Sequence, residues 1–169
     1  MSYVERPSAL RMMAFVHETM YELFREAYGP LRAAGLEPGQ RVLEVGCGPG
    51  FFTLPAADLV GQTGRVTSAD VSPTAVAHVR RKVEEAGATN VRVVLADATD
   101  TGLPRESFDL VFVFGLGHLV GGPERLWAEL HRLLKPGGTL AVEGQLEPSE
   151  DLYCSLGRQG RISQFRRIG

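Results

Sequence analysis

A loop with three alternating glycines, placed between an expected strand and an expected helix, constrains the fold more than any other feature of the chain. Residues 41–45 read RVLEV, a short apolar run typical of a buried strand, and residues 46–50 read GCGPG. An apolar helical pattern follows over residues 51–60. Glycine adopts backbone dihedrals closed to other residues and lets a ligand touch the backbone. The loop therefore predicts a ligand at the carboxyl end of a strand in an α/β sheet.

Strands and helices alternate along most of the chain. Ser72 is a good N-cap and Pro73 a good first residue for the helix after the second strand. The alternation predicts a doubly wound, mostly parallel sheet with right-handed crossovers and helices on both faces. The last two segments predict an antiparallel hairpin instead, with its turn at residues 158–160. The expected strands are residues 41–45, 65–69, 91–95, 109–114 and 139–142, the helices 51–60, 73–86 and 123–134, and the hairpin strands 152–156 and 161–167.

The N-terminal segment has apolar residues at helical spacing from residue 8 to 28. Gly29-Pro30 is expected to stop this helix, and a short turn of helix could follow to Leu36. We therefore interpret the 169 residues as a single domain. It would comprise an N-terminal helical cover (residues 1–36), a ligand-binding core (37–145) and a terminal hairpin (146–169).

The composition excludes several classes of protein. With 44% hydrophobic and 22% charged residues, the chain suits a globular domain. A formal net charge of −2 argues against a nucleic-acid partner. Two cysteines are too few for a disulfide framework or a four-cysteine zinc site, and no metal is expected. We see no apolar run that could span a bilayer and no secretory signal, so a cytoplasmic location is expected.

The spacing of the glycines limits which class of ligand the loop can bind. A dinucleotide fingerprint would place its third glycine at position 51, which is Phe, and no Gly-Lys-Ser/Thr of a phosphate-binding loop follows. The pattern suits a ligand that approaches the backbone but carries no pyrophosphate.

Two aspartates follow the next two strands. Asp70 could accept hydrogen bonds from both hydroxyls of a ribose, or it could cap the helix that begins near Pro73, a role that Ser72 fills better. Asp97 could accept from an adenine amino group, or it could form an Asx-turn within its own loop.

These residues together resemble a known family. Residues 44–50 (EVGCGPG), Asp70, Asp97 and residues 134–138 (LKPGG) look like a class I S-adenosylmethionine-dependent methyltransferase, most similar to the small "type 11" branch that includes quinone-biosynthesis enzymes. The resemblance runs from about Gly35 to Val142. It implies a seven-stranded Rossmann-like sheet of order 3-2-1-4-5-7-6 with the seventh strand antiparallel, and S-adenosylmethionine as the cofactor.

The resemblance also implies roles for individual residues. Glu44 would orient the loop and reach the methionine amino group through water, and Asp70 would hold the ribose hydroxyls. The remaining cofactor contacts would be Gly46, Cys47, Gly48 and Gly50 in the loop, Val71 on the adenine, Asp97 and Ala98 at the adenine edge, and the backbone of Phe114 and Gly115 at the methionine end.

Methyl transfer from a sulfonium needs alignment and exclusion of water more than it needs an acid, because the leaving group is already neutral. His118 is the candidate catalytic residue, as a base or to position the acceptor; alternatively it is an ordinary loop histidine. His17, Tyr21 and Tyr28 on the N-terminal helix would line the acceptor pocket, or simply pack on the sheet. The predicted function is methylation of a small or lipid-like acceptor. The alternative is a regulatory protein that binds the cofactor without turnover.

One departure from the family is visible. Only nine residues separate Val142 from Leu152, whereas a parallel crossover usually takes about a dozen or more. We therefore expect either a displaced sixth strand or an open sheet edge, and a homodimer that covers it.

Overall fold

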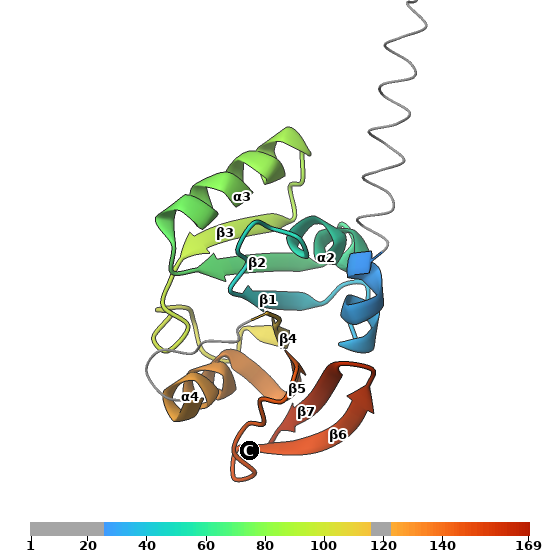
Figure 1. Cartoon of the computed structure of the whole chain (residues 1–169), viewed down its shortest axis with the longest axis vertical. Helices are drawn as coiled ribbons and strands as arrows, with labels where there is room; N and C mark the ends of the chain where they lie inside the picture. Colours follow the sequence, from blue (N-terminus) through green and yellow to red (C-terminus); the bar gives the residue numbers. More distant parts are fainter. Residues whose placement is uncertain (1–25, 116–122) are drawn as a thin grey trace, which may run out of the picture.

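The computed structural model describes residues 26–115 and 123–169. Their elements form one seven-stranded sheet of order β3-β2-β1-β4-β5-β7-β6 (Figure 1). Strands β1 to β5 pair in parallel, and β7 runs antiparallel to both of its neighbours. The predicted fold and strand order are thus confirmed. The elements are β1 (Arg41–Val45), α2 (Thr53–Val60), β2 (Arg65–Asp70), α3 (Pro73–Glu85), β3 (Val91–Leu95), β4 (Phe108–Val113), α4 (Pro123–Leu133), β5 (Leu134–Glu143), β6 (Tyr153–Gln159) and β7 (Ile162–Arg167).

The register of the central strands aligns their carboxyl ends. Val45, the last residue of β1, pairs with Ala69 of β2 and with Val113 of β4. Asp70 then pairs with Leu95 at the end of β3. The loops after β1, β2, β3 and β4 therefore leave the sheet side by side at the carboxyl ends of these strands, which we call the carboxyl edge of the sheet.

The sheet is covered on both faces. Leu43 and Val45 lie on the face that packs against α4, where Trp127 is buried. Val42 lies on the opposite face, with α2 and the helical residues 26–33. Because successive residues of a strand point to opposite faces, this alternation fixes which side chains share a layer. Among the described elements, no helix is both long and apolar enough to cross a bilayer.

The expected helix stop at Gly29-Pro30 is wrong. Both residues lie within the helical residues 26–33. Pro30 lacks the N–H that a helix uses, but Ala27 and Leu31 are fully buried on this segment. The amide of Gln164 on β7 also donates to the Ala33 carbonyl at 2.6 Å. Burial against the sheet outweighs the local preference of a glycine and a proline.

Two boundaries differ from the predicted ones. β5 begins at Leu134, directly after α4, although Lys135 to Gly138 were expected to separate helix from strand. The pairing of β4 with β5 shifts register between Phe108 and Leu110, which accommodates this irregular start. In the hairpin, Gln159 pairs with Ile162, so the turn lies at residues 160–161.

The expectation of a displaced sixth strand is wrong, because β6 has its predicted place in the strand order. β6 occupies the end of the sheet beyond β7, and residues 144–152 reach it without a helix. Glu143 is level with Ile162, and Tyr153 is level with Arg167, so this connection returns along the length of β7. Nine extended residues span up to about 30 Å, enough for a six-residue strand of about 20 Å. Without a covering helix, only Tyr153 of β6 is buried.

Candidate functional site

The glycine loop leaves β1 at the edge where the strand ends align. Gly46, Gly48 and Gly50 have φ angles of 75°, 49° and 74°, in the left-handed region that favours glycine. The N–H groups of Gly46 and Cys47 both donate to the carbonyl of Ala69, at 2.8 and 3.1 Å, so the loop is held against β2. A Cβ added at Gly48 would meet no atom within 4 Å. The backbone there faces open space that a ligand can occupy.

Asp70 ties this loop to α3. Its Oδ2 accepts from the Gly48 N–H and its Oδ1 from the Ser72 N–H, both at 2.8 Å. The Ser72 hydroxyl accepts from the Ala75 N–H and caps α3, as predicted. Because each carboxylate oxygen has more than one acceptor position, Asp70 retains capacity for ligand hydroxyls. Its side chain points at the glycine loop, as the ribose interpretation requires.

A buried polar cluster lies beneath the loop. Glu44 is 2% exposed, and its Oε2 accepts from the hydroxyls of Thr53 at 2.7 Å and Ser68 at 2.5 Å. Burial raises the pKa of Glu44 to about 7, against the two hydroxyls and Lys82, which lower it. Oε1 accepts no hydrogen bond from residues 26–115 or 123–169. That oxygen is therefore available to a water or an ammonium group.

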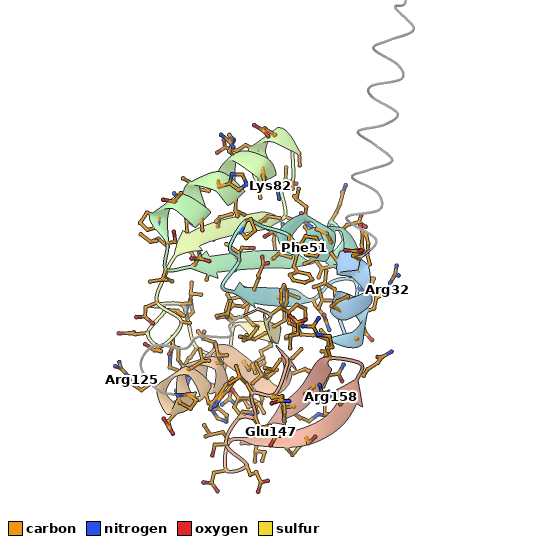
Figure 2. The ribbon with its side chains drawn as sticks, in the orientation of Figure 1. Arg32, Phe51, Lys82, Arg125, Glu147 and Arg158 are labelled. Atoms are coloured by element: carbon orange, nitrogen blue, oxygen red, sulfur yellow. The ribbon has the colours of Figure 1, made fainter. Side chains whose placement is uncertain are left out.

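α3 holds the loop from its other side. Lys82 lies on α3, where Figure 2 labels it. Its Nζ donates to the carbonyls of Pro49 at 3.1 Å and Gly50 at 3.0 Å. A Cβ added at Gly50 would lie 2.9 Å from Cγ2 of Val79, so helix and loop are in close contact there. The loop conformation is thus fixed by side chains from β2 and α3 as well as by its own glycines.

The residues expected at an adenine ring lie at the same edge. Val71 is 70% exposed and offers an apolar surface that an adenine ring could cover. Asp97 Oδ1 accepts from the N–H and hydroxyl of Thr99, both at 2.8 Å, which lowers the pKa of Asp97, chiefly through the N–H. The alternative Asx-turn is therefore present, while Oδ2 accepts nothing from the described part of the chain. Ala98 is partly buried against the core beside it.

The end of β4 carries an aromatic cluster. The Phe114 ring is buried, with its centroid 4.9 Å from that of Phe112 and 5.0 Å from that of Phe52. Phe51 meets Phe52 edge to face at 4.9 Å. Gly115 follows as an exposed residue with a φ of 72°. Because the Phe114 side chain belongs to the core, only the backbone of Phe114 and Gly115 is left at this strand end for a ligand to contact.

Cys47 faces the protein interior. It is 4% exposed and packs with Val76 and Val79 of α3. Burial raises the pKa of this thiol to about 12, so it stays protonated and is a poor nucleophile. Within the described ranges, no three His, Cys, Asp or Glu side chains are placed to hold a metal ion.

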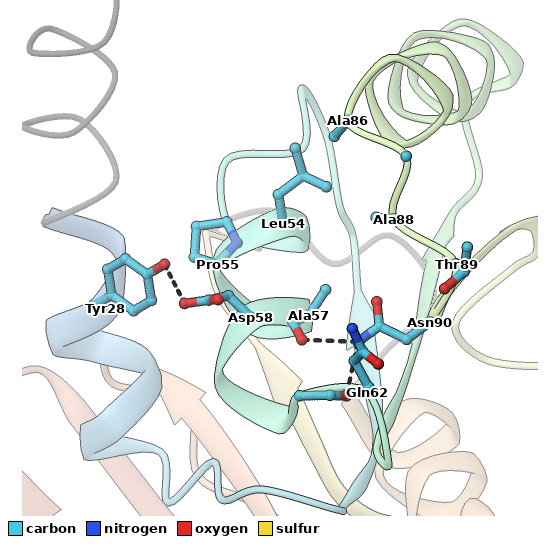
Figure 3. Close-up of a pocket in the computed structure, with 12 residues that line it drawn as sticks. Tyr28, Leu54, Pro55, Ala57, Asp58, Gln62, Ala86, Ala88, Thr89 and Asn90 are labelled. Atoms are coloured by element: carbon cyan, nitrogen blue, oxygen red, sulfur yellow. Dashed lines mark hydrogen bonds between the residues drawn. The ribbon is translucent and has the colours of Figure 1, made fainter.

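Tyr28 lies elsewhere than expected. Its hydroxyl donates to Asp58 near the end of α2 at 2.7 Å, and both residues line a groove of about 430 Å³ (Figure 3). The groove also borders Gly61 and Asn90, which precede β2 and β3. Tyr28 is thus near the amino edge of the sheet, away from the strand ends where an acceptor pocket was predicted. His17, Tyr21 and His118 lie outside the described residues.

The sequence interpretation missed several residues that support the site. Thr53 follows the last loop glycine by three residues, and Ser68 precedes Asp70 by two. Their closeness to these two features could have marked both as hydrogen-bond partners of Glu44. Lys82 is three residues after Val79 on α3, next to its buried stripe. Its contact with the loop depends on how α3 crosses the sheet, which no local pattern encodes.

The strand order, the glycine loop and the acid at the end of β2 define a Rossmann-like fold of the methyltransferase type. Residues 42–138, more than half of the chain, match the model of a family described as "Methyltransferase domain". The chain belongs to this methyltransferase domain family.

Individual relatives agree with the family match. The chain is 38% identical over 127 residues to a ubiquinone/menaquinone biosynthesis C-methyltransferase of Psychromonas ingrahamii, covering 74% of this chain and 49% of that protein. It is 31% identical over 144 residues to a demethylmenaquinone methyltransferase of Listeria welshimeri, covering 85% and 60%. A crystal structure of a SAM-dependent methyltransferase from Aquifex aeolicus superposes with a TM-score of 0.66 at 25% identity, covering 81% of this chain and 86% of that one. The chain spans about half the length of the curated relatives it matches.

Proposed function

We propose that this chain binds S-adenosylmethionine at the carboxyl edge of its sheet and transfers the methyl group to a small, lipid-like acceptor of the quinone type. The observation that carries the proposal is the placement of Asp70, which bonds the Gly48 N–H while flanked by the exposed Val71. That pairing of a carboxylate with an apolar surface suits the ribose and the adenine of an adenosyl group.

The described residues fit this cofactor at three points. The open backbone at Gly48 admits close approach of a ligand. The free Oε1 of Glu44 suits the methionine ammonium, directly or through water. Oδ2 of Asp97 suits the adenine amino group, while Oδ1 is held by Thr99. With Asp70, the two carboxylates of Glu44 and Asp97 lie at or just beyond the ends of three adjacent strands, β1, β2 and β3.

S-Adenosylmethionine, when bound, supplies an electrophilic methyl group on a sulfonium whose departure as a thioether needs no proton. An acceptor that took this methyl group as the carbon–sulfur bond broke would have to lose one proton, to a residue of the chain or to water. The loop of residues 46–50 would position the reacting centre, and its fixed backbone favours alignment without further ordering. His118 remains our proposal for the residue that takes the proton or orients the acceptor.

The acceptor class rests on the relatives. The Psychromonas ingrahamii and Listeria welshimeri proteins are named for methylation in quinone biosynthesis. Phe51, Phe52 and Phe114 add an aromatic cluster between the glycine loop and the end of β4. We propose a quinone precursor for this chain on these two grounds, with His17 and Tyr21 as further candidates at the acceptor.

The cofactor half of the proposal is tested by calorimetric titration with S-adenosylhomocysteine. Replacing Asp70 with Ala should weaken binding by about 1–3 kcal/mol, because it removes hydrogen bonds to a charged group. Asp151→Ala, on the exposed connection to β6, is the matched control and should bind like the wild type. Equal affinity of all three proteins would contradict the assignment of Asp70.

The acceptor half is tested by transfer of labelled methyl from the cofactor to demethylmenaquinone analogues. Accumulation of S-adenosylhomocysteine that depends on the acceptor is the expected result. Tight cofactor binding without transfer to any quinone precursor would favour a regulatory protein instead. The homodimer, the cytoplasmic location and the single-domain organisation remain predictions, and a mass measurement in solution tests the first.

A further inference from the structure

Three arginines lie side by side at the amino edge of the sheet, opposite the proposed cofactor site. Arg41 begins β1 and pairs with Arg65, which begins β2. Arg92 of β3 pairs with Thr67, two residues further along β2. All three arginines are exposed, and neighbouring strands are separated by about 4.8 Å.

The alternation of side chains places these arginines on one face. Leu43 and Val45, which follow Arg41 at two-residue intervals, pack in the core beside α4, as do Ala69 of β2 and Val94 of β3. Residues separated by an even number along a strand share a face. The three guanidinium groups therefore lie on the α4 face, beyond the end of that core.

A small cavity lies among them. It measures about 90 Å³ and is lined by the three arginines, by Thr67 and Ser107, and by the buried ring of Phe108. Pockets for drug-sized ligands measure roughly 300–1,000 Å³. A cavity of this size suits a single small ion rather than a nucleotide or a peptide.

Within the described residues, no ion pair of 4 Å or less neutralises the positive charge in this cavity. None of the ion pairs formed within residues 26–115 and 123–169 involves Arg41, Arg65 or Arg92. The Asp109 carboxylate lies near Arg41 and interacts with it electrostatically, but its Oδ2 accepts from the Arg41 backbone N–H and its Oδ1 from Lys135 Nζ, so it forms no ion pair with any of the three guanidinium groups. Arg65 donates through one Nη to the carbonyls of Gln62 and Gly64, which are neutral.

Like charges placed opposite one another destabilise a sheet. An anion among the arginines would remove that repulsion, and a guanidinium offers parallel N–H groups that match the oxygens of a phosphate. The Thr67 hydroxyl, which makes no hydrogen bond within the described ranges, adds a donor. We propose that Arg41, Arg65, Arg92 and Thr67 form a binding site for a phosphate-type oxyanion.

This site is independent of the proposed methyl transfer. It lies at the amino ends of β1 and β2, whereas Gly46 and Asp70 lie at their carboxyl ends, about 15–20 Å away for strands of this length. A free phosphate and the phosphate of a lipid headgroup share the same chemistry, so the test must separate them.

The experiment measures thermal unfolding and NMR shifts of the full chain with inorganic phosphate, against chloride at equal ionic strength. Phosphate should raise the wild-type Tm more than chloride and shift amides near Thr67. The double variant Arg41→Gln/Arg92→Gln should bind phosphate roughly tenfold more weakly or worse, and its Tm without phosphate should not fall. Arg158→Gln, on the exposed β6, should respond like the wild type.

Three outcomes would overturn the proposal. One is a wild-type response no larger than that to chloride. Another is an unchanged phosphate response in the double variant. The third is binding to phosphatidylcholine vesicles that contain phosphatidylglycerol, without any response to inorganic phosphate, which would assign the arginines to a membrane surface. Titration of the double variant with S-adenosylhomocysteine should give the wild-type affinity, so failure here is separable from failure of the proposed function.

Discussion

The glycine loop and the β6–β7 hairpin both contain glycines with positive φ, yet the two regions are held in place by different means. In the loop, Asp70 bonds the Gly48 N–H, and Lys82 bonds the carbonyl of Gly50. In the hairpin, Gly157 and Gly160 have φ of 118° and 60° and no atom near their missing side chains. Around these two glycines the hairpin relies on its backbone ladder, and its side-chain hydrogen bonds to other elements come from Tyr153, Gln164 and Arg167. The glycine loop is itself fixed by side chains from neighbouring elements.

The buried hydrogen bonds between polar side chains are concentrated beneath the glycine loop rather than at the hairpin. Glu44, Thr53 and Ser68 form a hydrogen-bonded cluster under the loop, with no counterpart among the exposed residues of β6. Buried polar networks that are satisfied by hydrogen bonds fix one conformation. A binding backbone needs such fixing, and an edge strand does not.

The largest effect should come from Gly50→Ala. The new Cβ would lie 2.9 Å from Val79 Cγ2 at a φ of +74°, so it adds overpacking to left-handed strain. We expect a loss of about 2–4 kcal/mol in urea unfolding. Gly160→Ala is the matched control, because it has a φ of +60° and open space around it, and should lose about 1–2 kcal/mol. Equal losses would show that contact with α3 does not distinguish the loop.

The next effect concerns the pH dependence of stability. Burial raises the pKa of Glu44 from 4.5 to about 7, so the folded state binds this proton more tightly than the unfolded state. The contribution to stability is complete below pH 4.5 and is lost as the pH rises to about 7, by roughly 3 kcal/mol at most. Glu44→Gln should remove this slope in urea unfolding measured across that range. Glu147→Gln, on the exposed connection to β6, should keep it, and a slope unchanged in both variants would refute the assignment.

A smaller effect is expected from Lys82→Met. The change removes two hydrogen bonds to the loop carbonyls from a partly exposed side chain. Binding of S-adenosylhomocysteine should weaken about three- to tenfold, because the loop loses its constraint from α3. Lys82→Arg should restore part of the affinity, and Arg81→Met, one residue away and exposed, should leave it unchanged. If Lys82→Met lowers the Tm but leaves the affinity intact, the lysine stabilises α3 only.

The smallest effect should come from the hairpin itself. Leu156 is 42% exposed and lies at the register shift of β6. Leu156→Ser should change stability by no more than about 0.5 kcal/mol, as exposed substitutions usually do. A larger loss together with a lower mass in solution would show that a second copy of the chain covers this surface.

The sequence predicts which segments form strands and helices better than it predicts how these elements pack against one another. The bounds of β1 and β3 follow directly from their apolar runs, and Ser72 caps α3 as its residue type suggests. The helix through Gly29-Pro30 was missed because burial of Leu31 outweighs local preference. The sixth strand was expected to be displaced because the connection after β5 is too short for a helix. An extended chain of nine residues is long enough to return along β7 without one.

At the candidate site, residue type and strand position located Asp70 and Asp97. The Asx-turn of Asp97 was predicted as an alternative, because its partner Thr99 is only two residues away. The bond from the Gly48 N–H to Asp70 was not predicted, because it joins residues 22 positions apart. Tyr28 was misplaced because the direction of its helix relative to the sheet depends on packing alone. The contact of Lys82 with the loop has the same origin, since it joins residues more than thirty positions apart.

The two cysteines give the glycine loop a built-in reporter. Cys154 is exposed on β6, whereas Cys47 is buried between the loop and α3. A thiol reagent added to the native protein should modify Cys154 at once, and Cys47 only when the loop lifts from the helix. The rate of the slow labelling phase therefore measures how often the loop opens, and no introduced probe is needed. An adenosyl ligand bound on the loop should slow the modification of Cys47.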